Sequence, residues 1–152
     1  MLTLVEKVFR LHRIRLFESL STADLQALAE IAEVATYTTG ERIITEGEPG
    51  DCLYVLLAGQ VTVATEREGR KVELATLKDG AVFGEMAILT EETRSAHVDA
   101  ATDCQCLTVA REPFRTLVEE RPQIAFGIFE ALSARLREAD HTISRLQHPA
   151  KT

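Results

Sequence analysis

Regularly spaced glycines constrain the fold of this 152-residue chain more than any other sequence feature. Between residues 40 and 80 they bound short runs rich in valine, isoleucine, leucine and threonine; the glycines are Gly40, Gly47, Gly50, Gly59, Gly69 and Gly80. Runs of this composition between turn residues are typical of β-strands. Many short, evenly spaced strands predict a β-roll, a jelly-roll-like barrel, over residues 34–110.

Two of these runs alternate between apolar and other residues, as strands with one face in a core do. The alternating apolar pairs are Val61 with Val63 and Val72 with Leu74. We expect both pairs to face the core.

Helical patterns flank the strands. Apolar residues recur at helical spacing between residues 2 and 16, and Ser21 offers an N-cap for a second helix. After the strands, Pro113 and Pro122 each suit the first position of a helix, and the second of these helices could extend to Leu146. N-terminal helices in 1–33, the roll and C-terminal helices in 112–147 together predict a mainly β single domain over residues 1–152.

Composition argues against several classes of protein. Lys and Arg number 17 against 24 Asp and Glu, a net charge of −7, which disfavours direct nucleic acid binding. No apolar run approaches the roughly 20 residues needed to cross a bilayer, so we expect no membrane insertion by this chain itself. An odd number of cysteines with no C-x-x-C pair predicts a cytoplasmic protein; they are Cys52, Cys104 and Cys106.

Residues 83–96 carry the chemistry. Gly84 lacks a Cβ, so the backbone there can approach a ligand closely where a short helix begins and its free N–H groups face an anion. Arg94 supplies a planar guanidinium that matches two phosphate oxygens, and Ser95 can add a donor. The carboxylate of Glu85 can only accept hydrogen bonds, which suits a ribose hydroxyl rather than a phosphate. Together these residues fit a ribose cyclic phosphate.

The same stretch resembles the phosphate-binding cassette of the cyclic-nucleotide-binding domain family, which includes catabolite activator proteins and protein kinase A regulatory subunits. Residues 83–89 read FGEMAIL, residues 90–93 read TEET and residues 94–96 read RSA. The resemblance extends to residues 16–17 with Leu20, and to 40–41, 46–51, 53–55 and 59, and so spans nearly the whole chain.

The resemblance implies a role for each cassette residue. Glu85 would bind the ribose hydroxyl, while Arg94, Ser95 and the amides near Ala87 and Ala96 would bind the cyclic phosphate. Phe83, Gly84 and Met86 would complete the turn. The implied protein is a sensor that binds cAMP or cGMP, uses no other cofactor or metal and catalyses nothing.

No helix-turn-helix, kinase-inhibitor segment or channel pore accompanies the cassette. The output that this sensor would control is therefore open, and the chain could be a small sensor or a piece of a larger protein.

Other interpretations of the same residues stay open. Glu85 and Arg94 could form an ordinary surface ion pair. His97, with Cys104 and Cys106, could suggest a haem or metal site, although strand alternation predicts a solvated face for His97 and packing roles for the two cysteines. A haem or other small-ligand sensor on the same fold, or a degenerate dimerisation domain, are the alternative functions.

The identity of the base is predicted from two positions. Ser95 stands where a threonine in this family often accompanies guanine, which favours cAMP over cGMP. Leu136 and Asp140 on the long helix are expected to contact the base, and the Asp140 carboxylate could accept from either purine.

The long helix also carries a heptad pattern. Its apolar residues are spaced alternately three and four apart; they are Phe129, Leu132, Leu136, Ala139, Ile143 and Leu146. This predicts a homodimer through residues 122–147, with ligand binding shifting the helix against the roll. The alternative is that the stripe closes over the roll as a lid.

Overall fold

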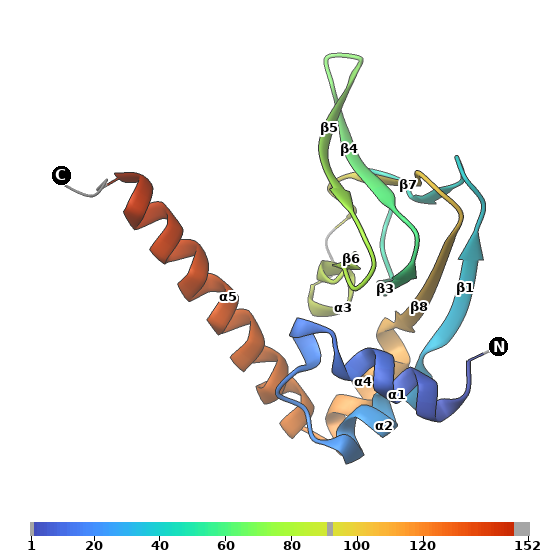
Figure 1. The fold of residues 1–152 in the computed structure, drawn as a ribbon, viewed down its shortest axis with the longest axis vertical. Coiled ribbons are helices and arrows are strands. Elements are labelled where there is room, and N and C mark those ends of the chain that lie inside the picture. The colour runs from blue at the N-terminus through green and yellow to red at the C-terminus, as the bar shows by residue number, and fades with distance from the viewer. Residues whose placement is uncertain (1, 91–92, 148–152) are drawn as a thin grey trace.

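The computed structural model describes residues 2–90 and 93–147, and within these ranges eight strands form two antiparallel sheets of four strands (Figure 1). The order in the first sheet is β1 (Glu33–Tyr37), β8 (Cys104–Ala110), β3 (Cys52–Ala58) and β6 (Val82–Phe83). The order in the second is β2 (Arg42–Ile44), β7 (His97–Ala100), β4 (Val61–Arg67) and β5 (Arg70–Leu77). The predicted roll with flanking helices is confirmed.

Helices gather at one end of the roll. They are α1 (Leu4–His12), the 3₁₀ turn η1 (Arg15–Phe17), α2 (Thr22–Ile31), α4 (Arg111–Glu120) and α5 (Gln123–Gln147), while α3 (Met86–Leu89) lies within the roll. As predicted, Ser21 caps α2, accepting a hydrogen bond of 3.1 Å from the Asp24 N–H. Figure 1 shows α5 leading away from the roll rather than covering it.

The helix termini differ in detail from the expected ones. The first helix ends at His12 and gives way to η1 instead of continuing to residue 16. Pro113 is the third residue of α4, where its missing N–H is still one of the four that lack an intrahelical partner. Pro122 lies just before α5 begins.

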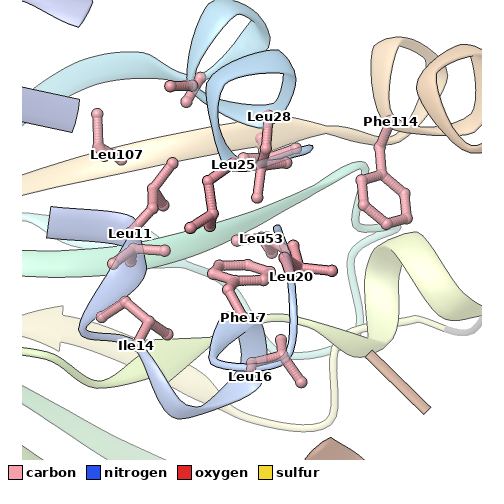
Figure 2. Close-up of a cluster of buried hydrophobic side chains, with 14 of the residues drawn as sticks. Leu11, Ile14, Leu16, Phe17, Leu20, Leu25, Leu28, Leu53, Leu107 and Phe114 are labelled. Carbon is pink, nitrogen blue, oxygen red and sulfur yellow. The ribbon is translucent and has the colours of Figure 1, made fainter. Parts of the chain in front are cut away.

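Two hydrophobic clusters share the β3–β8 pair. The first lies between these strands and the helices, and Figure 2 shows Phe17 and Leu25 there close to Leu53. The second lies between the two sheets and contains Leu56, Val98 and Cys106. Since successive strand residues point to opposite faces, β3 and β8 are buried on both sides.

The expected inward face of β5 is wrong. Val72 and Leu74 are 42% and 58% exposed. The reason is that β5 is an edge strand paired only with β4, and the two form a ribbon that projects beyond the rest of the roll (Figure 1). Val61 at the base of the ribbon is fully buried, as predicted, whereas Val63 is half-buried.

In the described part of the chain, no helix combines the length and apolar character that a bilayer span requires.

Candidate ligand-binding site

The site is built around the turn that joins β6 to α3. Gly84 has φ +71°, in the left-handed region that disfavours side chains. A Cβ at this position would lie 2.7 Å from Arg94 Nη1 and 3.2 Å from Ile44 Cδ1. Glycine is therefore required twice here, once by the backbone and once by the close approach of the Arg94 guanidinium.

Arg94 lies beneath this turn and is held by main-chain oxygens. Its Nη1 donates to Gly84 O at 2.9 Å and its Nη2 donates to Cys52 O at 2.8 Å. A guanidinium has five N–H donors, so these two bonds leave it the capacity to bind a further acceptor. The side chain is half-buried, which strengthens any contact with an anion relative to a fully solvated cation.

A stacked pair of aromatic rings lies against the Arg94 guanidinium. The guanidinium carbon is 6.0 Å from the centroid of the Tyr54 ring. Tyr54 stacks on Phe83 with 5.0 Å between ring centroids and 5° between planes, and burial raises the pKa of its hydroxyl above the usual range. Tyr54 thus stays neutral and provides an aromatic face for the Arg94 cation.

A cavity of about 290 Å³ opens beside the turn. Its apolar wall comes from both sheets, and its polar rim from the segment before β7; the lining residues are Ile44, Val63, Leu77, Val82, Phe83, Gly84, Glu85, Ala87, Thr93, Arg94, Ser95, Ala96 and Val98. The volume lies at the lower end of the range typical of small-molecule pockets, roughly 300–1,000 Å³.

Seven of the eight cassette residues singled out in the sequence line this cavity, while the side chain of Met86 lies outside what the structure describes. No ion pair joins Glu85 to Arg94 in the described residues, so the surface-pair interpretation has no support in the geometry. The Ala87 N–H donates within the turn to Gly84 O at 3.2 Å, and the N–H groups of Ser95 and Ala96 make no backbone hydrogen bond to another described residue.

The loop before β3 fixes the backbone of Arg94. The Arg94 N–H donates to Glu48 O and the Gly47 N–H donates to Arg94 O, both at 2.8 Å. Gly50 in the same loop passes directly over the Arg94 side chain, because a Cβ there would lie 2.3 Å from Arg94 Nε. Gly50 therefore belongs to the site, although the sequence analysis identified it only as one of the turn glycines between strands.

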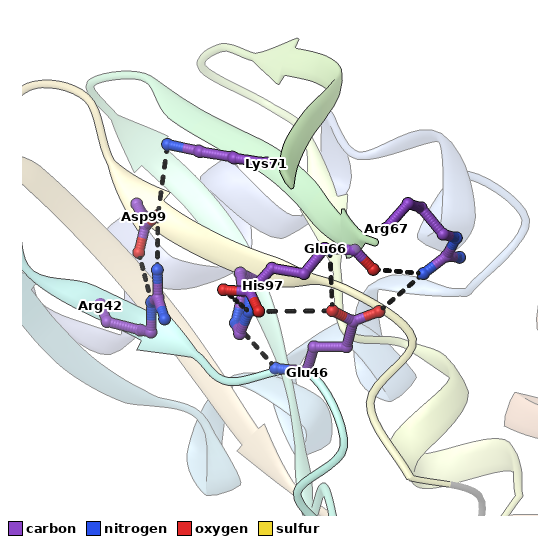
Figure 3. Close-up of polar contacts among 7 residues, drawn as sticks. All are labelled: Arg42, Glu46, Glu66, Arg67, Lys71, His97 and Asp99. Carbon is purple, nitrogen blue, oxygen red and sulfur yellow. Dashed lines mark hydrogen bonds and ion pairs between the residues drawn. The ribbon is translucent and has the colours of Figure 1, made fainter. Parts of the chain in front are cut away.

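The predicted solvated face for His97 is wrong. His97 is 8% exposed, and its Nδ1 accepts a 3.0 Å hydrogen bond from the Glu46 N–H. Figure 3 shows its ring enclosed by Glu46, whose carboxylate accepts from the Glu66 N–H, and by Glu66 itself. These partners cover the outer face of β7, and polar packing replaces the solvent that alternation predicted.

The other groups considered for a metal or redox site have packing roles. Cys104 and Cys106 are 5% and 0% exposed in the cluster between the sheets, as predicted, and burial raises the pKa of the Cys106 thiol to about 12. Among the described residues no group of three or more histidine, cysteine, aspartate or glutamate side chains could hold a metal ion.

Arg111, Leu136 and Asp140 lie outside the lining of the cavity. Arg111, which the sequence analysis missed, donates from α4 to Ala87 O and Gly50 O, both at 2.7 Å, and does not itself line the cavity. Leu136 and Asp140 do not line the cavity, and Leu136 is 64% exposed on α5. Their contact with a base stays a prediction and requires α5 to approach the roll.

Comparisons with known proteins agree with this geometry. Residues 34–121 match the family described as the cyclic nucleotide-binding domain. The cyclic AMP receptor protein of Thermus thermophilus is 33% identical over 126 residues, which cover 82% of this chain and 58% of that protein. A cGMP-dependent protein kinase of Caenorhabditis elegans is 34% identical over 133 residues, covering 84% of this chain and 17% of the kinase.

A solved structure has the same fold. The N-terminal domain of a transcriptional regulator from Streptomyces coelicolor A3(2) superposes with a TM-score of 0.77 and is 28% identical, covering 87% of this chain and 95% of that one. The chain thus spans less than two thirds of the Thermus protein but nearly all of this isolated domain.

Proposed function

Because this chain belongs to the cyclic nucleotide-binding domain family, we propose that it binds a 3′,5′-cyclic nucleotide in the cavity beside Gly84 and releases it unchanged. The observation that carries the proposal is the meeting of a cation and an acceptor at one cavity: Arg94 and Glu85 both line it without pairing to each other. A cyclic nucleotide presents a phosphate for the first and a ribose hydroxyl for the second.

The donors at the rim support the phosphate assignment. Ser95 contributes a hydroxyl and an N–H, and Ala96 contributes another N–H that is not used by the described backbone. The apolar wall opposite them suits a purine, which needs surface contact more than hydrogen bonds. The cavity is only about 290 Å³, so we expect it to enclose the ribose phosphate and leave part of the base exposed.

We assign cAMP as the preferred ligand and cGMP as the weaker one. This rests on Ser95 in place of a threonine and on the Thermus relative, which is named a cyclic AMP receptor. The kinase relative is named for cGMP, so similarity to the family does not by itself decide the base. The three free cysteines fit a location in the reducing cytoplasm.

Calorimetric titration with cAMP, cGMP and linear AMP tests the proposal directly. We expect cAMP to bind more tightly than cGMP, and linear AMP to bind weakly. Arg94→Ala should weaken cAMP binding by at least about tenfold, because a hydrogen bond to a charged group is worth about 1.5–3 kcal/mol. Wild-type affinity in this variant, or hydrolysis of cAMP during prolonged incubation, would contradict the assignment.

We further propose that α5 carries the output and joins two copies of the chain. Its base is anchored by Ile124, Ile128 and Ala131, which are buried. Beyond them the heptad residues Leu136 and Ile143 are 64% and 51% exposed, an apolar stripe that a second α5 could cover.

A further inference from the structure

Arg111 joins three segments of the molecule through one side chain. It is the first residue of α4, and its own N–H donates to Asp51 O at 2.7 Å. Its Nε donates to Ala87 O in α3 at 2.7 Å, and its Nη2 donates to Gly50 O at 2.7 Å and to Thr90 O at 3.3 Å. The start of α4 is thus tied both to the loop before β3 and to the end of α3.

Arg94 contacts the same loop, at residues 50–52, from the side of the cavity. Its Nη2 donates to Cys52 O at 2.8 Å, and its Nε lies 2.3 Å from where a Cβ of Gly50 would be. Residues 50–52 therefore lie between two guanidinium groups, one lining the cavity and the other rooted in α4. Arg94 also holds Gly84 O at the start of the turn, and Arg111 holds Ala87 O three residues later.

Only an arginine suits this position. A guanidinium presents N–H donors in a rigid plane and can bridge carbonyls from different segments, whereas an ammonium is a compact charge on a flexible stem. Carbonyl oxygens are neutral partners, so the bonds fix geometry without neutralising the cation. Movement of residues 50–52 or of α3 consequently changes the bonds that orient the first turn of α4.

We propose that Arg111 is a positioning residue that transmits occupancy of the cavity to α4 and α5. The inference rests on the proposed function, since it takes the phosphate of a cyclic nucleotide as the ligand that draws on Arg94. When Arg94 turns donors toward that phosphate, its bonds to Cys52 O and Gly84 O readjust. Arg111 carries the resulting shift of residues 50–52 and α3 into α4, and the short link at residues 121–122 passes it to α5.

Hydrogen exchange of the full chain, measured with and without saturating cAMP, separates the steps. In the wild type we expect cAMP to slow exchange in residues 83–96 and to change exchange in residues 111–147. Arg111→Gln should keep the first effect and lose most of the second. Arg115→Gln, an exposed arginine one turn further along α4, serves as the matched control and should behave as the wild type.

Arg111→Lys keeps the charge and decides the question if the glutamine variant does not fold. We expect the lysine variant to bind cAMP and also lose most of the change in residues 111–147, because the single nitrogen of an ammonium cannot take the places of both Nε and Nη2. A folded Arg111 variant with the full wild-type change would overturn the proposal, as would a wild type that binds cAMP without any change in α4 and α5. A wild type with no effect of cAMP or cGMP even in residues 83–96 would instead refute the proposed function, and this inference with it.

Discussion

Gly50→Ala tests whether ligand binding depends on where the Arg94 side chain lies, because the substitution leaves the arginine itself unchanged. The φ angle of Gly50 is outside the positive range, so alanine is compatible with the backbone there. The new Cβ would lie 2.3, 2.5 and 2.8 Å from Arg94 Nε, Cζ and Cδ, and all three atoms would have to move. The variant therefore displaces the guanidinium without removing it.

The expected effects on binding and stability differ. Displacing Arg94 costs one or both charged hydrogen bonds to the phosphate, about 1.5–3 kcal/mol each. With a factor of ten per 1.4 kcal/mol, the Kd for cAMP should rise by about 10-fold if one weak bond is lost and by up to roughly 20,000-fold if both bonds are lost in full. The free energy of unfolding should change by less than about 1 kcal/mol, because the entropic gain from a compatible Gly→Ala change offsets the lost bonds to carbonyls.

Calorimetry gives the Kd and urea unfolding gives the stability of the same samples. Gly40→Ala is the matched control: Gly40 has φ +88° and nothing within 4 Å of a Cβ. It should lose about 1–2 kcal/mol of stability from left-handed strain and keep its affinity for cAMP. Unchanged affinity for cAMP in Gly50→Ala would show that the position of the Arg94 side chain beside Gly84 does not determine ligand binding.

Three further predictions concern stability and assembly. Asp99 accepts a 2.8 Å hydrogen bond from Arg42, which lowers the pKa of Asp99, so Asp99→Asn should cost about 0.5–1 kcal/mol near neutral pH. In urea titrations the difference from wild type should shrink once the pH falls below the unfolded pKa of about 4 and vanish only below the lower folded pKa. Arg121→Ala should cost about 1–3 kcal/mol in thermal unfolding, because it removes a 3.0 Å partner from Asp24, which is 4% exposed. Leu136→Glu should turn a dimer into a monomer that still binds cAMP, as judged by sedimentation; a wild type that is monomeric at high concentration would exclude the α5 dimer.

The parts of the fold that depend on local sequence could be predicted. Glycines at turns and β-branched runs between them determine the roll, and the Ser21 cap is a contact within four residues. The gathering of Gly84, Glu85 and Arg94 at one cavity could also be anticipated, because the cassette is contiguous and its chemistry is complementary.

Features that depend on distant neighbours could not be predicted. Alternation correctly separated the two faces of β7 but could not reveal that Glu46 and Glu66 would cover His97. It likewise placed Val72 on a regular strand without showing that β5 lies at an edge with no layer over it. The role of Arg111 was invisible because its carbonyl partners are 21, 24 and 61 residues away in the chain.

Because β3 is buried on both faces, its odd-numbered and even-numbered residues pack into different hydrophobic clusters. Leu53, Val55 and Leu57 belong to the cluster under the helices, while Tyr54 and Leu56 belong to the cluster beside the cavity. Substitutions at the odd positions therefore act on the packing under the helices. Those at the even positions act on the layer behind the cavity, where Tyr54 stacks on the lining residue Phe83. Within seven consecutive residues, one strand thus offers separate positions for changing the helix packing and for changing the support of the cavity wall.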